Sequence, residues 1–168
     1  MTVVLTERLR LEPIGPAHAG DIAPMLADPR VGATMGGVRD RAYAEELTAR
    51  HAARWAEDGF GLWAAYSRED GGFVGRGGIQ RTRLEGRGVV EAGWCLMPDR
   101  WGRGLATELA RAGLALGFGD LALEEIVAFT QPFNDASRAV MLRLGMTYVR
   151  DCVYADLPHV LYAARPPR

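Results

Sequence analysis

Polar and apolar residues alternate along residues 6–14, near the start of the chain. Leu9 and Leu11 share one face of an extended chain there, and charged residues occupy the other face. A period of two residues is typical of a strand with one face buried and the other in water. The pattern therefore predicts a first, half-buried strand.

The rest of the chain falls into four segments with helical spacing of apolar residues and six short runs that are typical of strands. Glycines at 59 and 145 mark the ends of two of the helices. The glycine-bearing segment 28–38 is expected to be a mobile loop. The predicted helices are 16–26, 41–58, 105–117 and 136–144, and the predicted strands are 62–69, 73–82, 89–97, 124–131, 146–155 and 159–165.

Two of these strand pairs are predicted to be antiparallel hairpins. Asp70-Gly71-Gly72 joins the first pair, and a short turn joins the last two strands. The order is then β-α-α-β-β-β-α-β-α-β-β, which indicates an α+β fold with a mixed, mostly antiparallel sheet of seven strands and about four helices. No repeat, low-complexity tract or linker divides the sequence, so residues 1–168 are expected to form a single domain.

The predicted helix 105–117 carries a stripe of small residues. Ala106, Ala110, Gly113 and Gly117 recur at helical spacing beside leucines. A glycine inside a helix costs about 1 kcal/mol relative to alanine. We therefore expect this helix to pack closely against a sheet or to lie close to a ligand.

Composition narrows the function classes. The chain has a formal net charge of −1, which gives no global attraction to nucleic acid or to an anionic membrane, so neither is an expected partner. Apolar runs are too short to span a bilayer, and the first residues do not resemble a signal peptide. Cys95 and Cys152 are the only cysteines, and they are expected to be structural thiols in a cytoplasmic protein.

The histidines suggest no metal site. His18, His51 and His159 lie far apart and lack the spacing of metal ligands. No metal is therefore expected.

A glycine-rich stretch, DRWGRGLATEL at residues 99–109, precedes the helix that begins near Leu105. Free N–H groups and the helix dipole make such a turn an anion site. A nucleotide-triphosphate loop is excluded, because the chain has no glycine followed by lysine. The dinucleotide fingerprint is closer and lacks only its last glycine. The acidic residues near Glu124 precede the next strand and do not follow it, and the strands before the loop are predicted to be antiparallel hairpins; these two features disfavour NAD binding but leave it as an alternative.

A third pattern fits better. Trp101-Gly102-Arg103-Gly104-Leu105-Ala106 is similar to the pyrophosphate loop of the GNAT superfamily of N-acetyltransferases, with Trp101 in place of the usual Gln or Arg. The chain resembles, nearly end to end, the RimJ/RimL-type branch of that superfamily. The resemblance rests on TERLRLEP at residues 6–13, on VEAGWCLMPDRWGRGLATE at residues 90–108 and on Asn134-Asp135-Ala136-Ser137-Arg138 before LRLGM.

The resemblance implies a GNAT fold and an N-acetyltransferase that moves an acetyl group from acetyl-CoA directly to a primary amine. A non-catalytic acyl-CoA sensor of the same fold is the alternative. The acceptor is implied to be a small-molecule or peptide amine, bordered by segments near 35–37 and 156–158. Homodimers are common in the branch, so a homodimer is compatible with the resemblance.

Two residues are candidates for catalysis. Glu91 shares a strand face with Gly93, Cys95 and Met97 by alternation, and the resemblance implies a general base or a group that orients the amine. A salt-bridge role is the alternative. Ser137 is implied to donate a proton to the leaving sulfur, with helix capping as the alternative.

The cofactor is implied to bind along one continuous path. The backbone of the strand near Cys95 is implied to hold the pantetheine arm, and Asn134 to bind the pantetheine or the site backbone; capping is again the alternative for Asn134. The implied cofactor-binding residues are Cys95, Leu96, Met97, Gly102, Arg103, Gly104, Leu105, Ala106, Thr107, Asn134 and Arg138.

Overall fold

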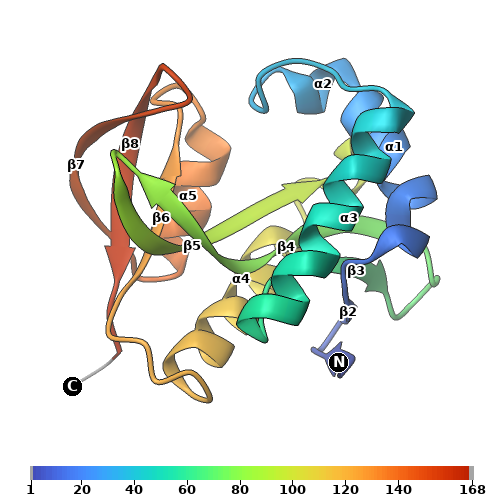
Figure 1. Cartoon of the computed structure of the whole chain (residues 1–168), viewed down its shortest axis with the longest axis horizontal. Helices are drawn as coiled ribbons and strands as arrows, with labels where there is room; N and C mark the ends of the chain where they lie inside the picture. Colours follow the sequence, from blue (N-terminus) through green and yellow to red (C-terminus); the bar gives the residue numbers. More distant parts are fainter. Residues whose placement is uncertain (1, 167–168) are drawn as a thin grey trace.

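The computed structural model describes residues 2–166 and consists of one mixed sheet flanked by helices (Figure 1). The sheet has eight strands in the order β1-β2-β3-β4-β5-β6-β8-β7. The strands are β1 (Val4–Leu5), β2 (Leu9–Pro13), β3 (Leu62–Ser67), β4 (Phe73–Leu84), β5 (Arg87–Leu96), β6 (Ile126–Thr130), β7 (Thr147–Tyr154) and β8 (Leu157–Ala164). The predicted α+β class and the mostly antiparallel sheet are confirmed.

Five α-helices and two short 3-10 helices connect the strands. The helices are η1 (Pro16–His18), α1 (Ala19–Ala27), α2 (Pro29–Gly32), α3 (Arg41–Asp58), η2 (Pro98–Arg100), α4 (Leu105–Phe118) and α5 (Asp135–Arg143). The α3 prediction is confirmed at both ends. Asp40 caps its first turn by accepting from the Tyr43 N–H at 2.9 Å, and Gly59 ends it with a left-handed φ of 76°.

The structure has one strand more than the seven predicted and one α-helix more than the approximately four predicted, for two local reasons. A turn at Thr6, whose N–H donates to the Leu9 carbonyl at 2.9 Å, separates the short β1 from β2. In the expected loop 28–38, Asp28 accepts from the Arg30 N–H and Pro29 occupies the first helical position, so the four-residue α2 forms. Both are cap and turn signals that the hydrophobic pattern does not report.

Helices cover both faces of the sheet. On one face, α1 and α3 bury residues such as Ile22 and Leu47 against β3 and Cys95 of β5. On the other face, α4 and α5 contribute Leu109 and Met141 to the larger core. In Figure 1, α1, α2 and α3 lie towards one end of the molecule, and α5 with β6, β7 and β8 lies towards the other.

The small-residue stripe of α4 packs against the sheet as predicted. A Cβ added at Gly113 would lie 3.1 Å from the Gly78 carbonyl carbon of β4, and one at Gly117 would lie 2.4 Å from Ile126 Cδ1 of β6. Larger residues at these positions would push α4 away from the sheet. The C-terminal half of α4 is therefore held close to β4 and β6.

The two middle strands pair at a single position. β5 and β6 are parallel neighbours, and their only bridge joins Glu91 to Val127. Every other pair of adjacent strands is antiparallel with at least two bridged positions. Past Glu91 the two strands therefore part, and a gap opens in the middle of the sheet.

Candidate active site

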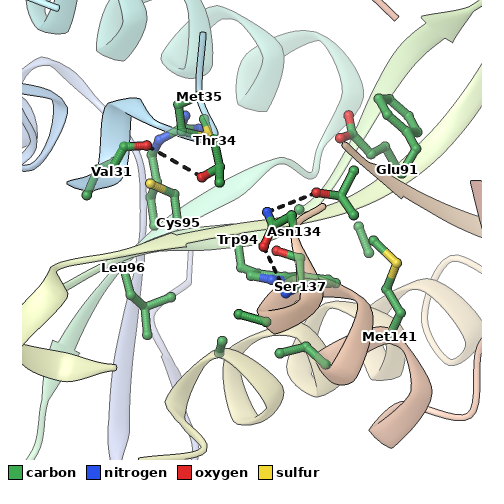
Figure 2. Close-up of a pocket in the computed structure, with 18 of the residues that line it drawn as sticks. Val31, Thr34, Met35, Glu91, Trp94, Cys95, Leu96, Asn134, Ser137 and Met141 are labelled. Atoms are coloured by element: carbon green, nitrogen blue, oxygen red, sulfur yellow. Dashed lines mark hydrogen bonds between the residues drawn. The ribbon is translucent and has the colours of Figure 1, made fainter. Parts of the chain in front are cut away.

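A cleft of about 1050 Å³ is lined by β5 and β6 where these strands part. Further walls come from α2, α3 and β4, from α5, from the start of α4 and from the turn between β7 and β8. Figure 2 shows Val31 and Met35 towards one side of the cleft, and Asn134 and Ser137 towards another. The cleft brings together ten of the thirteen predicted site residues: Glu91, Cys95, Leu96, Gly102, Gly104, Leu105, Ala106, Thr107, Asn134 and Ser137.

The loop before α4 presents a run of free backbone amides. Gly102 and Gly104 adopt left-handed φ values of 72° and 75°, a region that strains residues with a side chain. Gly104 is the N-cap of α4, and no side chain caps this helix. Within residues 2–166, no protein oxygen accepts a hydrogen bond from the N–H groups of residues 102–107. Such a run at the positive end of a helix is suited to an anion.

The N-terminal segment holds this loop in place. The carboxylate of Glu108, in the first turn of α4, accepts from the Thr6 hydroxyl at 2.6 Å and from both the backbone N–H and Nε of Arg8 at 2.7 Å. Arg8 Nη1 also donates to the Arg103 carbonyl at 2.8 Å. Sequence reasoning found no role for this TERL segment beyond a strand. Its polar side chains position the loop.

Glu91 lies where β5 and β6 meet and faces the cleft. Gln80 of β4 is its partner across the strands, and Gln80 Nε2 donates to Glu91 Oε2 at 3.3 Å. Arg54 Nη1 of α3 donates in turn to Gln80 Oε1 at 2.5 Å. Among the described residues Glu91 has no ion-pair partner within 4.0 Å, so the salt-bridge interpretation is wrong.

Burial controls the protonation of Glu91. It raises the pKa of this carboxyl to about 7, against the opposing effects of the Gln80 hydrogen bond and of the Arg76 and Arg54 charges. A carboxyl with this pKa exchanges protons readily near neutral pH. The arrangement therefore suits a proton acceptor.

Asn134 and Ser137 lie at the start of α5. Asn134 Oδ1 accepts from the Ser137 N–H at 3.2 Å, and Asn134 Nδ2 donates to Thr130 Oγ1 at 3.0 Å (Figure 2). The capping alternative for Asn134 is therefore confirmed. The capping alternative for the Ser137 side chain is not, because Asn134 caps the helix and the partly buried Ser137 side chain lines the cleft.

Three predicted cofactor-binding residues are not in the cleft lining. The Met97 N–H donates to the Val74 carbonyl at 2.9 Å, and the Arg103 carbonyl accepts from Arg8. Arg138 directs Nε to the Tyr162 hydroxyl at 3.4 Å and Nη1 to the Pro132 carbonyl at 3.2 Å. A cofactor role for Met97, Arg103 or Arg138 stays a prediction.

Both cysteines are buried free thiols, as predicted. Cys95 Sγ lies 3.8 Å from Met25 Sδ of α1, and burial raises the pKa of its thiol. The thiol is therefore protonated and packed near neutral pH.

Sequence reasoning missed a polar cluster on the wall formed by α3 and β4. Both ring nitrogens of His51 and the Nε atom of Arg76 are buried and lack a hydrogen-bond partner among residues 2–166, and both residues line the cleft. Burial, with the charges of Arg76, Arg54 and Arg50, lowers the pKa of His51 to about 3, so its ring is neutral. The helical spacing of Leu47, His51 and Arg54 was the available signal.

Residues 2–166 contain neither a candidate metal centre nor a membrane-spanning helix. No group of three or more His, Cys, Asp or Glu side chains there is arranged to hold a metal ion. None of the helices in that range is long and apolar enough to cross a bilayer.

Comparison with known proteins gives a consistent family. The family model described as "Acetyltransferase (GNAT) domain" matches residues 8–147. The YkkB protein of Bacillus subtilis is 29% identical over 96% of this chain and 94% of its own length. A crystal structure of an acetyltransferase from Agrobacterium tumefaciens superposes with a TM-score of 0.86 and 29% identity, covering 99% of this chain and 95% of that one.

The name of a third relative includes acetyl coenzyme A. The "FsC-acetyl coenzyme A-N(2)-transacetylase" of Aspergillus fumigatus is 30% identical over 86% of this chain, which spans 64% of that relative's length. Solved ribosomal-protein acetyltransferases share only 13–17% identity and support the fold alone. The RimJ/RimL-type branch therefore stays a prediction. The matched family model, which spans most of the chain, shows that the chain belongs to the GNAT acetyltransferase family.

Proposed function

We propose that this protein is an acetyl-CoA-dependent N-acetyltransferase that passes the acetyl group directly to a primary amine in a ternary complex. The proposal rests on one observation: the free backbone amides of residues 102–107 and the carboxyl of Glu91 line the same cleft. An anion site and a base that line the same cleft suit a substrate with a phosphate end and a reactive end. Acetyl-CoA has both.

The loop amides are proposed to bind the pyrophosphate of coenzyme A. Each hydrogen bond from an N–H group to a charged oxygen contributes about 1.5–3 kcal/mol, and the helix terminus adds roughly 0.3–1 kcal/mol. Thr107 supports this role, because its hydroxyl is buried beside the loop and has no hydrogen-bond partner among the described residues. The hydrogen bonds from Thr6 and Arg8 to Glu108, which we call the N-terminal clamp, keep these donors in place before the ligand binds.

The gap between β5 and β6 is proposed to hold the pantetheine arm with its thioester near Glu91. The acceptor nitrogen attacks the thioester carbon, and Glu91 takes the proton that this nitrogen loses. The carbon–sulfur bond then breaks, and the Ser137 hydroxyl donates a proton to the departing sulfur. Glu91 releases its proton to solvent, and Ser137 regains one from solvent, so no net proton is gained or lost. A backbone N–H of β5 near Cys95 is proposed to polarise the thioester carbonyl.

The required strength of the base depends on the acceptor. At neutral pH a lysine amine with a pKa of about 10.4 loses its proton at a cost of about 4.6 kcal/mol, whereas deprotonation of an α-amine costs about 1 kcal/mol. A carboxylate with a pKa of about 7 is a modest base. This base is strong enough for either amine only if part of the amine is already neutral or if the site favours the neutral form.

The finer branch assignment is part of the proposal. A RimJ/RimL-type enzyme is supported by the TERL segment, whose Thr6 and Arg8 hold the anion loop through Glu108. An aromatic residue at position 101 also fits that branch, and Trp101 Nε1 donates to the Leu96 carbonyl at 3.0 Å. A cytoplasmic location and a homodimer remain predictions from the sequence.

The loop assignment is tested with two glycines that share a backbone conformation. Gly104 and Gly86 have φ values of 75° and 80°, and neither is crowded by a side chain nearer than 3.5 Å. Gly104→Val is expected to weaken acetyl-CoA binding at least about tenfold by calorimetry, because its side chain blocks the amides. Gly86→Val, in the β4–β5 turn, controls for backbone strain. Equal affinity in both variants would mean that the loop does not bind the cofactor.

The base assignment is tested by the acceptor's own basicity. Glu91→Gln keeps an acceptor oxygen for Gln80 but cannot take a proton. We expect the rate of acceptor-dependent CoA release at pH 7 to fall more for lysine-like amines than for α-amines, because the former carry the larger deprotonation cost. A decrease of equal size for both amine classes, or none, would remove Glu91 from the role of base.

Saturable acetyl-CoA binding without CoA release from any amine would favour the alternative function, a non-catalytic acyl-CoA sensor.

The raised pKa of Glu91 also predicts how stability varies with pH. The folded carboxyl titrates near pH 7 and the unfolded one near 4.5, so between these values the folded state binds the extra proton. Wild-type stability therefore declines relative to Glu91→Gln as pH rises through this window, by about 1–3 kcal/mol in total. Urea unfolding of both proteins at several pH values measures the difference. A difference that is constant from pH 4.5 to 8 would contradict the shift.

A further inference from the structure

The cleft is far more cationic than the protein as a whole. The chain has a net charge of −1, yet Glu91 is the only carboxylate among the cleft-lining residues that the structure describes. Six arginines line the same cleft: Arg30, Arg50, Arg54, Arg76, Arg100 and Arg143. Such a concentration of one sign in a cleft attracts ligands of the opposite sign.

Half of these arginines already have a carboxylate partner outside the cleft lining. Arg30 pairs with Asp28 at 2.7 Å, Arg50 with Glu46 at 3.7 Å and Arg100 with Asp70 at 2.9 Å. Within residues 2–166, no carboxylate lies within 4.0 Å of the other three, Arg54, Arg76 and Arg143. Of these, Arg143 is exposed in the last turn of α5, whereas Arg54 and Arg76 belong to the wall beside Glu91.

Arg76 is the least satisfied of the six. It is half-buried, its Nε atom is fully buried, and its side chain forms no hydrogen bond within the described part of the chain. A buried donor without a partner destabilises the folded protein, and the cost is larger for a charged group. On β4 it is paired with Cys95 of β5 and shares the sheet face of Gln80 and Glu91.

The neighbours of Arg76 offer more unused polar atoms. His51 of α3 is 3% exposed, and neither of its ring nitrogens has a hydrogen-bond partner in the part of the chain that the structure describes. Its ring is neutral and therefore supplies one N–H donor. Arg54 uses Nη1 for Gln80, and its charge acts on both His51 and Glu91. Two cations and a neutral donor thus surround the same space beside Glu91.

These groups are separate from the proposed cofactor loop. They come from α3 and β4, whereas the free amides belong to the loop between β5 and α4. If the amine meets Glu91, the remainder of the acceptor meets this wall. The arginines of this wall would repel an acceptor that carries several positive charges. An anionic group on the acceptor would instead accept hydrogen bonds from their unpartnered N–H groups.

We propose that the acceptor is a primary amine that also carries an anionic group, a carboxylate or a phosphate, which Arg76 binds with help from Arg54 and His51. This rests on the proposed N-acetyltransferase function and names the substrate class. Arg76 is then a specificity-determining residue. Glu91 receives the proton of the amine, and Arg76 holds the other end of the same molecule.

Matched acceptors test this in the full-length protein. The panel pairs 4-aminobutyrate with butylamine, whose amines are similarly basic, and 2-aminoethylphosphonate with ethylamine; glycine and β-alanine, each with its amide, vary the spacing. The readout is CoA release from acetyl-CoA. We expect kcat/KM for at least one anionic acceptor to exceed that of its neutral partner by about tenfold or more, mainly through a lower KM. The carboxylate and phosphonate members separate the two anion types.

Variants of two arginines in β4 locate the effect. Arg76→Gln is expected to lower the ratio of kcat/KM for the preferred anionic acceptor to that for its neutral partner at least about tenfold. Loss of the Arg76 charge also acts on Glu91, but that effect is common to both acceptors and cancels in the ratio. Arg76→Lys keeps the charge without the planar fork, so we expect it to restore part of the preference. Arg83→Gln is the matched control, because Arg83 is exposed on the same strand and outside the cleft. Thermal melting checks that each variant is folded.

The possible failures are distinguishable. Turnover of neutral amines as fast as anionic ones, or an unchanged preference in Arg76→Gln, overturns the acceptor class and leaves the acetyltransferase proposal standing. Acetyl-CoA binding without turnover of any acceptor in the panel also counts against the acceptor class. If acetyl-CoA itself does not bind, the proposed function fails first.

Discussion

The parting of β5 from β6 is the constraint on which the rest of this site depends. The two strands are joined by a single bridge, between Glu91 and Val127. A fully paired sheet at this point would place hydrogen-bonded strands where the cleft lies. Because the strands separate past Glu91, this carboxyl stands at the junction, and the amides before α4 face the cleft from the end of β5. One topological feature thus creates the gap, positions the base and leaves the anion donors free.

The electrostatics of the cleft follow from the same arrangement. Burial raises the pKa of Glu91 to about 7, and the charges of Arg76 and Arg54 oppose that rise. Without those cations the carboxyl would hold its proton to still higher pH and would be a poorer base near neutrality. The same cations disfavour a protonated amine next to them and favour an anionic group. A single cluster therefore influences both the state of the base and the choice of acceptor.

The sequence predicts those parts of the structure that local chemistry determines. The bounds of α3, the close packing of Gly113 and Gly117, and the free amides after Gly102 all follow from caps, spacing and the steric demands of glycine. The hydrophobic pattern did not predict the short elements β1 and α2. A turn at Thr6 separates β1 from β2, and the Asp28 cap starts α2. Local polar contacts outweighed periodicity there.

The acceptor wall could not be predicted, because it depends on register and packing between distant segments. Arg76 faces the cleft because β4 pairs with β5 in one register, which sets Arg76 opposite Cys95 and Gln80 opposite Glu91. A shift of one residue would turn each side chain to the other face. His51 joins them only because α3 packs over that face. The contact from Arg8 to Glu108 joins residues 100 positions apart in the sequence, so it could not be predicted either.

The central claim is that backbone amides at residues 102–107 bind the pyrophosphate of coenzyme A, and amide NMR of the isotope-labelled protein tests it most directly. Titration with coenzyme A is predicted to shift these amide signals more than any others, whereas pantetheine, which lacks the pyrophosphate, shifts signals of β5 and leaves the loop unchanged. Saturable binding of coenzyme A with unperturbed loop amides would contradict the account.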